Sequence, residues 1–196
     1  MRYTEILEEM PELIGAQDFS MMEPEHNRNL TQKLLSAPEK DILRDTKDFI
    51  LFRTGTDNGN IALIDKQLEQ VDYWIRFNTM QKKLVDKSVT QVAIWRRRGS
   101  PWVQGITRFV FFEYLLLHWP TVMSDAKQTP DGRDFWLDVM ARATVKDFSV
   151  GLADFNASTV EWYRSDEGPF QTWIASKMSA WSGHQRSQGL RFLVSI

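Results

Sequence analysis

Residues 109–170, FVFFEYLLLHWPTVMSDAKQTPDGRDFWLDVMARATVKDFSVGLADFNASTVEWYRSDEGPF, contain the pattern that decides the fold. The apolar run at residues 106–119 predicts a central strand covered on both faces. A helix is expected after Pro130, because apolar side chains recur there at helical spacing: Phe135, Trp136, Val139, Met140 and Ala143. Residues 148–155 predict a second strand. This order predicts a right-handed crossover with a ligand-binding loop after the first strand.

The part of the chain before this stretch predicts antiparallel strands. Residues 48–55 and 60–67 are apolar runs on either side of Asn58-Gly59, a pair typical of tight hairpins. Residues 71–77 alternate in polarity and extend the sheet, and residues 89–98 add a strand with a basic end. Behind the crossover we expect helices and a last strand, at residues 158–163, 170–181 and 189–196.

Residues 1–47 predict a helical segment of the same domain, with short helices at 4–10, 30–35 and 39–45. Residues 48–196 then form the core. The predicted fold class is α/β, with a mixed, mostly antiparallel sheet and one β-α-β crossover.

Composition excludes several classes of function. The net charge of −2 gives no bulk attraction to nucleic acid, so we do not expect nucleic acid as a partner. The absence of cysteine excludes disulfides, thiolate metal sites and a cysteine nucleophile. Three scattered histidines, His26, His118 and His184, make no metal site, and we expect none.

The apolar runs are too short to cross a membrane, because the longest, residues 109–119, is broken by Glu113 and His118. The N-terminus is acidic, whereas a secretory signal is basic and then apolar. A soluble cytoplasmic protein is therefore expected.

Two motifs stand beside the crossover. Residues Gln128-Thr129-Pro130-Asp131-Gly132-Arg133 join the first strand to the helix, where backbone N–H groups at a helix start favour an anion. Asn156 is followed by Tyr163 with seven residues' spacing, then by Gly168 and Phe170. With the order of elements, these motifs make residues 48–170 resemble the GNAT acyltransferases, which transfer an acyl group from acyl-coenzyme A to an amine.

The resemblance implies an acetyl-CoA site and an amine acceptor, either a protein or a small molecule. In the family the loop reads Gln/Arg-x-x-Gly-x-Gly/Ala and binds the pyrophosphate, a role carried here to Gln128, Thr129, Gly132 and Arg133. Asn156 would hold the pantetheine arm, and Tyr163 would protonate the departing thiolate. Met123 and Ser124 are assigned to the coenzyme, with backbone N–H groups between Thr121 and Ser124 stabilising the oxyanion. The family shapes its acceptor site with the N-terminal segment, residues 1–47.

Glu113 is the candidate general base, because a carboxylate in a buried strand has a raised pKa. The alternative is a solvent-facing Glu113 or a pair with Arg108. His118 is the second candidate base, and its alternative is a packed, hydrogen-bonded residue. Tyr163 and Asn156 also have structural alternatives, as a packed ring and as a helix cap.

A different class of function stays open, namely a catalytically inactive GNAT-like interaction protein, for example a phage inhibitor of a host protein. Asp131 and Asp134 place carboxylates at the expected phosphate site, and Asp134 replaces the second glycine of the family pattern. Phage-encoded proteins that resemble degenerate GNAT folds have a similar loop. A weaker alternative is nucleic-acid contact through residues 95–102, which combine Trp95 and Trp102 with three arginines.

Overall fold

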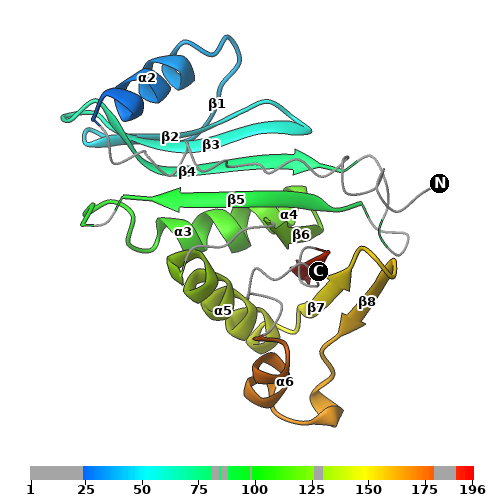
Figure 1. Ribbon diagram of the computed structural model, residues 1–196. Helices are drawn as coiled ribbons and strands as arrows, with labels where there is room; N and C mark the ends of the chain where they lie inside the picture. The colour runs from blue at the N-terminus through cyan, green and yellow to red at the C-terminus, as the bar shows by residue number, and fades with distance from the viewer. Residues whose placement is uncertain (1–23, 81–83, 85–87, 98, 126–129, 179–188) are drawn as a thin grey trace. The chain divides into compact units, whose positions relative to one another are not determined.

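The computed structural model describes residues 24–80, 84, 88–97, 99–125, 130–178 and 189–196 (Figure 1). The described residues divide into two compact units. We call those within 13–79 and 92–114 the meander unit, and those within 80–91 and 115–196 the crossover unit. Both units combine helices with sheet, which confirms the α/β class and a mixed, mostly antiparallel sheet.

The meander unit contains one helix before its strands and one after them. Its elements are α2 (Pro24–Leu35), β1 (Asp41–Asp45), β2 (Phe49–Thr54), β3 (Asn58–Asp65), β4 (Gln70–Thr79), most of β5 (Thr90–Arg96), α3 (Ile106–Phe109) and most of the π-helical turn η2 (Val110–Leu115). Strands β1 to β4 pair with their neighbours in antiparallel order, and β5 follows β4. The predicted meander is confirmed.

The β2–β3 hairpin differs from its prediction in the position of the turn. The residue with a positive φ angle is Gly55, at 75°, and Asn58 and Gly59 already belong to β3. A side chain at position 55 would meet the Asn58 carbonyl, since a Cβ there would lie 2.1 Å from that oxygen. Only glycine suits this turn.

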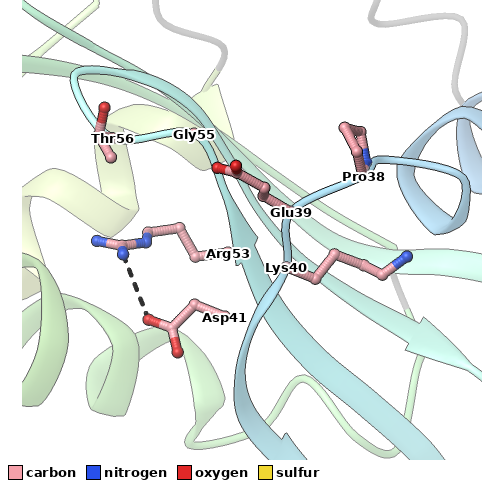
Figure 2. A pocket seen from close by; sticks show the side chains of 7 residues that line it. All are labelled: Pro38, Glu39, Lys40, Asp41, Arg53, Gly55 and Thr56. Atoms are coloured by element: carbon pink, nitrogen blue, oxygen red, sulfur yellow. Dashed lines mark ion pairs between the residues drawn. The ribbon is translucent and has the colours of Figure 1, made fainter.

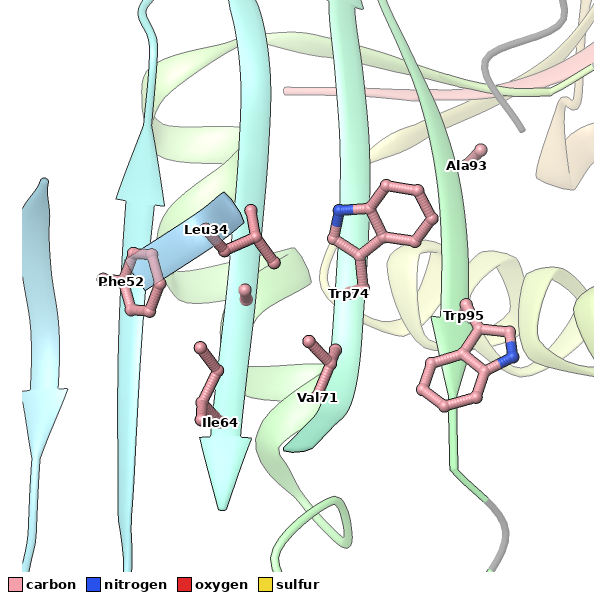
Figure 3. Packing of buried hydrophobic residues seen from close by; sticks show 8 residues of the cluster. Leu34, Phe52, Ile64, Val71, Trp74, Ala93 and Trp95 are labelled. Atoms are coloured by element: carbon pink, nitrogen blue, oxygen red, sulfur yellow. The ribbon is translucent and has the colours of Figure 1, made fainter. Parts of the chain in front are cut away.

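The core of the meander unit lies between α2 and the strands (Figure 3). Leu34 from the helix packs with side chains of four strands, Phe52, Ala62, Ile64, Val71, Trp74, Ala93 and Trp95. Asn27 attaches the helix to β4 at the backbone: its Nδ2 donates to the Val71 carbonyl at 3.0 Å, and its Oδ1 accepts from the Val71 N–H at 2.8 Å. Apolar burial and one paired amide therefore position α2.

The crossover unit contains α4 (Leu116–His118), β6 (Thr121–Ser124), α5 (Pro130–Val145), β7 (Ser149–Asp154), β8 (Thr159–Trp162), the 3-10 turn η3 (Ser165–Glu167), α6 (Phe170–Ser176) and β9 (Leu190–Ser195). Strand β9 lies between β6 and β7 and pairs antiparallel with both. Strands β6 and β7 consequently run in the same direction and are joined through α5. This β-α-β connection has one strand inserted between its two parallel strands.

The predicted central strand at residues 106–119 is wrong. These residues are helical, in the succession α3, η2 and α4. Their exposed apolar and acidic positions recur every four residues, at Phe109, Glu113 and Leu117, while the residues between them are largely buried. A helix that is buried on most of its surface has the composition of a buried strand, so the apolar run alone misled the prediction.

Three further segments differ from the predictions. Residues 39–45 contain β1 in place of a helical turn, and residues 159–162 form β8 in place of a helix. Helix α6 ends at Ser176, and β9 confirms the last strand. The short helix at 4–10 lies outside the described residues. In the part of the chain that the structure describes, no helix combines the length and the apolar character needed to span a bilayer.

Candidate functional site

The residues expected around the oxyanion lie in β6. Met123 belongs to a buried cluster with Leu84, Val89, Ala153, Phe155 and Leu193. Ser124 is 2% exposed, and its hydroxyl accepts the Phe192 N–H at 3.2 Å. Both side chains are therefore buried within the crossover unit. Only the backbone groups of Met123 and Ser124 are left for the expected contact with the coenzyme.

A buried polar group follows β6 directly. Asp125 accepts a hydrogen bond from Gln91 Nε2 at 2.7 Å, and both residues are almost completely buried. Arg191, also buried, has its pKa lowered by burial, while the charge of Asp125 acts in the opposite direction. The hydrogen bond joins the start of β5 to the residue after β6, and Arg191, near the start of β9, is related to Asp125 by charge.

The expected phosphate loop overlaps the start of α5. Gln128 and Thr129 lie outside the described residues, whereas Gly132 and Arg133 belong to the first turn of the helix, which begins at Pro130. Arg133 is paired with the neighbouring Asp134 at 3.4 Å. The acidic neighbour thus contacts the cation that was expected to bind phosphate.

Asn156 and Tyr163 flank β8, whereas a helix was expected between them. Asn156 lies exposed in the β7–β8 turn, where its N–H donates to Asp154 Oδ1 at 2.8 Å. The Tyr163 hydroxyl donates to the Gly168 carbonyl at 3.1 Å, and its ring packs against Phe170 and Trp173. Helix capping by Asn156 is excluded, and the packing of Tyr163 is observed.

Glu113 is exposed and lies in the helical turn η2. The prediction that it is a desolvated base in a buried strand is therefore wrong. His118 ends α4, is also exposed, and lies with its ring 5.8 Å from that of Trp119. Among the residues covered by the structure, no group of three or more histidine and carboxylate side chains is placed to hold a metal ion.

The turn between β5 and α3 was not predicted as a site. The Asp72 carboxylate is fully buried and binds both Arg97, at 2.6 and 3.0 Å, and the Ser100 hydroxyl. Trp102 donates its indole N–H to Asp65 at 2.9 Å. Two buried aspartates on the meander therefore fix the path of this turn. The arginines and Trp102 of the basic segment are visible in the sequence, but the aspartates that hold them are distant along the chain.

Two glycines in this turn have a left-handed backbone, Gly99 with φ of 79° and Gly105 with φ of 84°. A Cβ at either position would have no heavy atom within 4 Å. The backbone here is open on its outer side, directly before the helix that begins at Ile106.

A pocket of about 440 Å³ opens at the other end of the meander unit (Figure 2). It is lined by Pro38, Glu39, Lys40, Asp41, Arg53, Gly55 and Thr56. Asp41 and Arg53 are register partners on β1 and β2 and form an ion pair at 3.4 Å. The sequence did not predict this pairing of charges, because residues 39–45 were expected to be helical, whereas residues 41–45 form β1.

Tyr114 lies against the ion pair of the pocket. Its hydroxyl donates to Asp41 Oδ2 at 3.2 Å, and the Arg53 guanidinium lies 5.9 Å from the centre of its ring. Burial raises the pKa of Tyr114 to about 12; Arg53 opposes this shift and Asp41 adds to it. The phenol is therefore neutral at physiological pH.

The sequence matches no family model, and comparisons with curated proteins and with solved structures give no match. Function must be argued from the site itself.

Proposed function

We propose that this chain is a GNAT-like N-acyltransferase that transfers an acetyl group from acetyl-CoA to an amine. The observation that carries the proposal is the succession of β5, an arginine- and glycine-containing turn, and a helix. Arg96-Arg97-Arg98-Gly99-Ser100-Pro101 fits the first part of the family pattern Gln/Arg-x-x-Gly-x-Gly/Ala, with Pro101 at its last position. This turn is a second candidate phosphate loop, in the meander unit, besides Gly132 and Arg133, which belong with Asn156 and Tyr163 to the crossover unit.

The physical basis is the helix start. Helical residues continue from Ile106 to His118 through α3, η2 and α4, so their peptide dipoles favour an anion at the N-terminal end. Gly99 and Gly105 leave the backbone accessible there. Arg96 is exposed at the end of β5 and supplies a cation. Phosphate recognition of this kind combines backbone N–H groups with a charge-assisted contact.

In the proposed reaction the neutral amine attacks the thioester carbon, a C–N bond forms, the C–S bond breaks, and the thiolate takes a proton. By the resemblance, Tyr163 would donate that proton and Asn156 would bind the pantetheine arm. Because the Tyr163 hydroxyl donates its single proton to the Gly168 carbonyl, this role requires the hydroxyl to exchange that hydrogen bond for one to the thiolate. The ammonium that forms in the attack releases its extra proton to solvent.

Calorimetric titration with acetyl-CoA tests the proposal. We expect micromolar binding by the unmodified chain and at least a tenfold loss in Arg96→Gln, about 1.4 kcal/mol. Arg28→Gln, which removes an exposed arginine of α2, is the matched control and should bind normally. Absence of binding heat at millimolar coenzyme contradicts the acyltransferase.

The second candidate is a catalytically inactive GNAT-like protein that binds another protein, such as the host target of a phage inhibitor. The observation that favours it is the engagement of Arg97 by Asp72, which neutralises one of the turn's cations. The same titration separates the two candidate functions. Binding of acetyl-CoA supports the acyltransferase, whereas the absence of binding is compatible only with the inactive interaction protein.

A further inference from the structure

The pocket of the meander unit has the size of a small-molecule site. Its volume of about 440 Å³ falls in the range of roughly 300 to 1,000 Å³ that is usual for ligand pockets. Four of its seven lining residues are charged: Glu39, Lys40, Asp41 and Arg53. The ligand class therefore depends on which of these charges face the pocket and remain uncompensated.

Strand alternation separates the charges. Asp41 and Arg53 are register partners and share one side of the β1–β2 ladder, and Glu39, two residues before Asp41, points to the same side (Figure 2). Lys40 points to the opposite side. Its ammonium donates to the carbonyls of Leu35 and Ala37 after the last turn of α2. The Lys40 ammonium therefore caps the helix and is directed away from Asp41 and Arg53, although Lys40 also lines the pocket.

Of the two carboxylates that line the pocket, Glu39 is the one without a charged partner among the described residues. Arg53 is balanced by Asp41 at 3.4 Å. Glu39 is exposed and has neither a hydrogen bond nor an ion pair with any residue that the structure describes. A ligand in the pocket therefore meets the Glu39 carboxylate, which has no counter-ion in the described part of the chain. This carboxylate favours a ligand that carries a positive charge.

The hydrogen-bonding groups narrow the choice of cation. Arg53 and Tyr114 both contact Asp41 through Oδ2. Glu39, Asp41 and Thr56 line the pocket, and all three side chains carry oxygen acceptors. A primary ammonium has three N–H donors for such acceptors. A quaternary ammonium would need an aromatic face, and the face of Tyr114 is occupied by Arg53.

We propose that this pocket binds the primary ammonium group of a small amine, with Glu39 as the principal anionic contact and Asp41 and Thr56 as further acceptors. The inference goes beyond the proposed acyl transfer, because it concerns binding alone and is tested without coenzyme. It stands or fails independently of whether acetyl-CoA binds.

The probe is butylammonium, added as the hydrochloride of butylamine at pH 7 to the ¹⁵N-labelled full chain. We expect saturable shifts of the Gly55 and Thr56 amide signals with a Kd of about 1 mM, since a five-atom ligand supplies only a few kcal/mol. Butanol and tetramethylammonium should bind at least tenfold more weakly, because the first lacks the charge and the second lacks the donors.

Glu39→Gln should weaken butylammonium binding about tenfold while leaving the amide spectrum folded, because the residue is exposed. Glu25→Gln, at an exposed glutamate of α2, is the matched control and should bind like the unmodified chain. Thr56→Val provides a second, neutral test and should weaken binding several-fold. Equal binding of butanol or tetramethylammonium, or unchanged binding by Glu39→Gln, overturns the inference, as does the lack of any saturable shift.

Discussion

Asp72 and Arg97 form a two-point ion pair in which a completely buried carboxylate accepts Nε at 2.6 Å and Nη2 at 3.0 Å. The Arg97 N–H also donates to the Asp72 carbonyl at 2.8 Å, so backbone and side chain join β4 to the residue after β5 twice. The hydrogen bond to Asp72 raises the pKa of Arg97, and the charges of Asp72 and Asp65 add to the rise against the effect of burial. This pair determines where the turn before α3 begins.

Asp72→Asn should lower the free energy of unfolding by about 3 kcal/mol, because it removes the negative partner of a largely buried pair. Urea unfolding followed by tryptophan fluorescence measures the change. Asp45→Asn is the matched control: Asp45 pairs with Lys66 on the surface, at 2.5 Å, with 54% of its side chain exposed. Its replacement should cost about 0.5 kcal/mol. Equal losses in the two variants would contradict a structural role for the buried pair.

Asp65 predicts a pH dependence of stability. Burial raises its pKa, but hydrogen bonds from the Leu68 N–H, the Trp102 indole and the Gln67 N–H outweigh burial, so the pKa lies below its usual value. A lowered carboxyl pKa contributes stability that is complete above the unfolded pKa, about 3.9, and is lost as the pH falls through the folded value.

Asp65→Asn should therefore be less stable than the unmodified chain at pH 7, by about 1 to 2 kcal/mol. The difference should shrink as the pH falls below about 4, where the aspartate itself becomes protonated. Urea midpoints across this pH range make the comparison. If the difference in stability between the two proteins stayed constant down to the lowest pH, the stabilising effect of Asp65 would not depend on its ionised form.

Local patterns predicted the elements whose burial follows a simple period. The alternation in β4, the helical spacing in α5 and the apolar end of the chain in β9 all correspond to observed elements. The segment from Ile106 to His118 was missed because it is buried on most of its surface, so its polar positions are too few to mark a helical period. Strand β8 was missed because residues 156–163 were compared with the family motif, which predicts a helix there. The alternation of Val160 and Trp162 with polar residues, which is typical of a strand, was not considered.

The candidate sites depended on contacts that a sequence does not display. Asp72 and Arg97 are 25 residues apart, and Asp41 and Tyr114 are 73 residues apart. The basic segment at residues 95–102 was recognisable in the sequence. The sequence did not show, however, that Arg97 of this segment is paired with Asp72. Likewise, the opposite directions of the Glu39 and Lys40 side chains, just before β1, became apparent only in the structure (Figure 2).

Gly55→Ala should destabilise the protein by about 2 to 3 kcal/mol. An alanine there combines a left-handed backbone with a Cβ only 2.1 Å from the Asn58 carbonyl oxygen, so the hairpin must shift. Gly105→Ala is the matched control, because φ is 84° but no heavy atom lies within 4 Å of the added Cβ. Its cost should be limited to about 1 kcal/mol of backbone strain. Thermal unfolding of both variants measures the difference, and a larger loss for Gly105→Ala would contradict the turn geometry.

Tyr163→Phe separates a structural from a catalytic role of the phenol. Phenylalanine retains the ring contacts with Phe170 and Trp173 and removes the hydroxyl that donates to the Gly168 carbonyl. We expect a stability loss of about 1 kcal/mol, the usual net value of one hydrogen bond.

If Tyr163 protonates the thiolate, the same variant should reduce turnover of acetyl-CoA at least tenfold at a temperature where it is fully folded, with unchanged coenzyme affinity. Glu161→Gln provides the control for disturbance of this aromatic cluster, because Glu161 accepts the Trp173 indole N–H at 3.2 Å and lies outside the proposed proton transfer. A turnover loss that is equal in both variants would assign Tyr163 to packing. A loss confined to Tyr163→Phe would assign the proton to its hydroxyl, because only that variant removes the donor while keeping the ring.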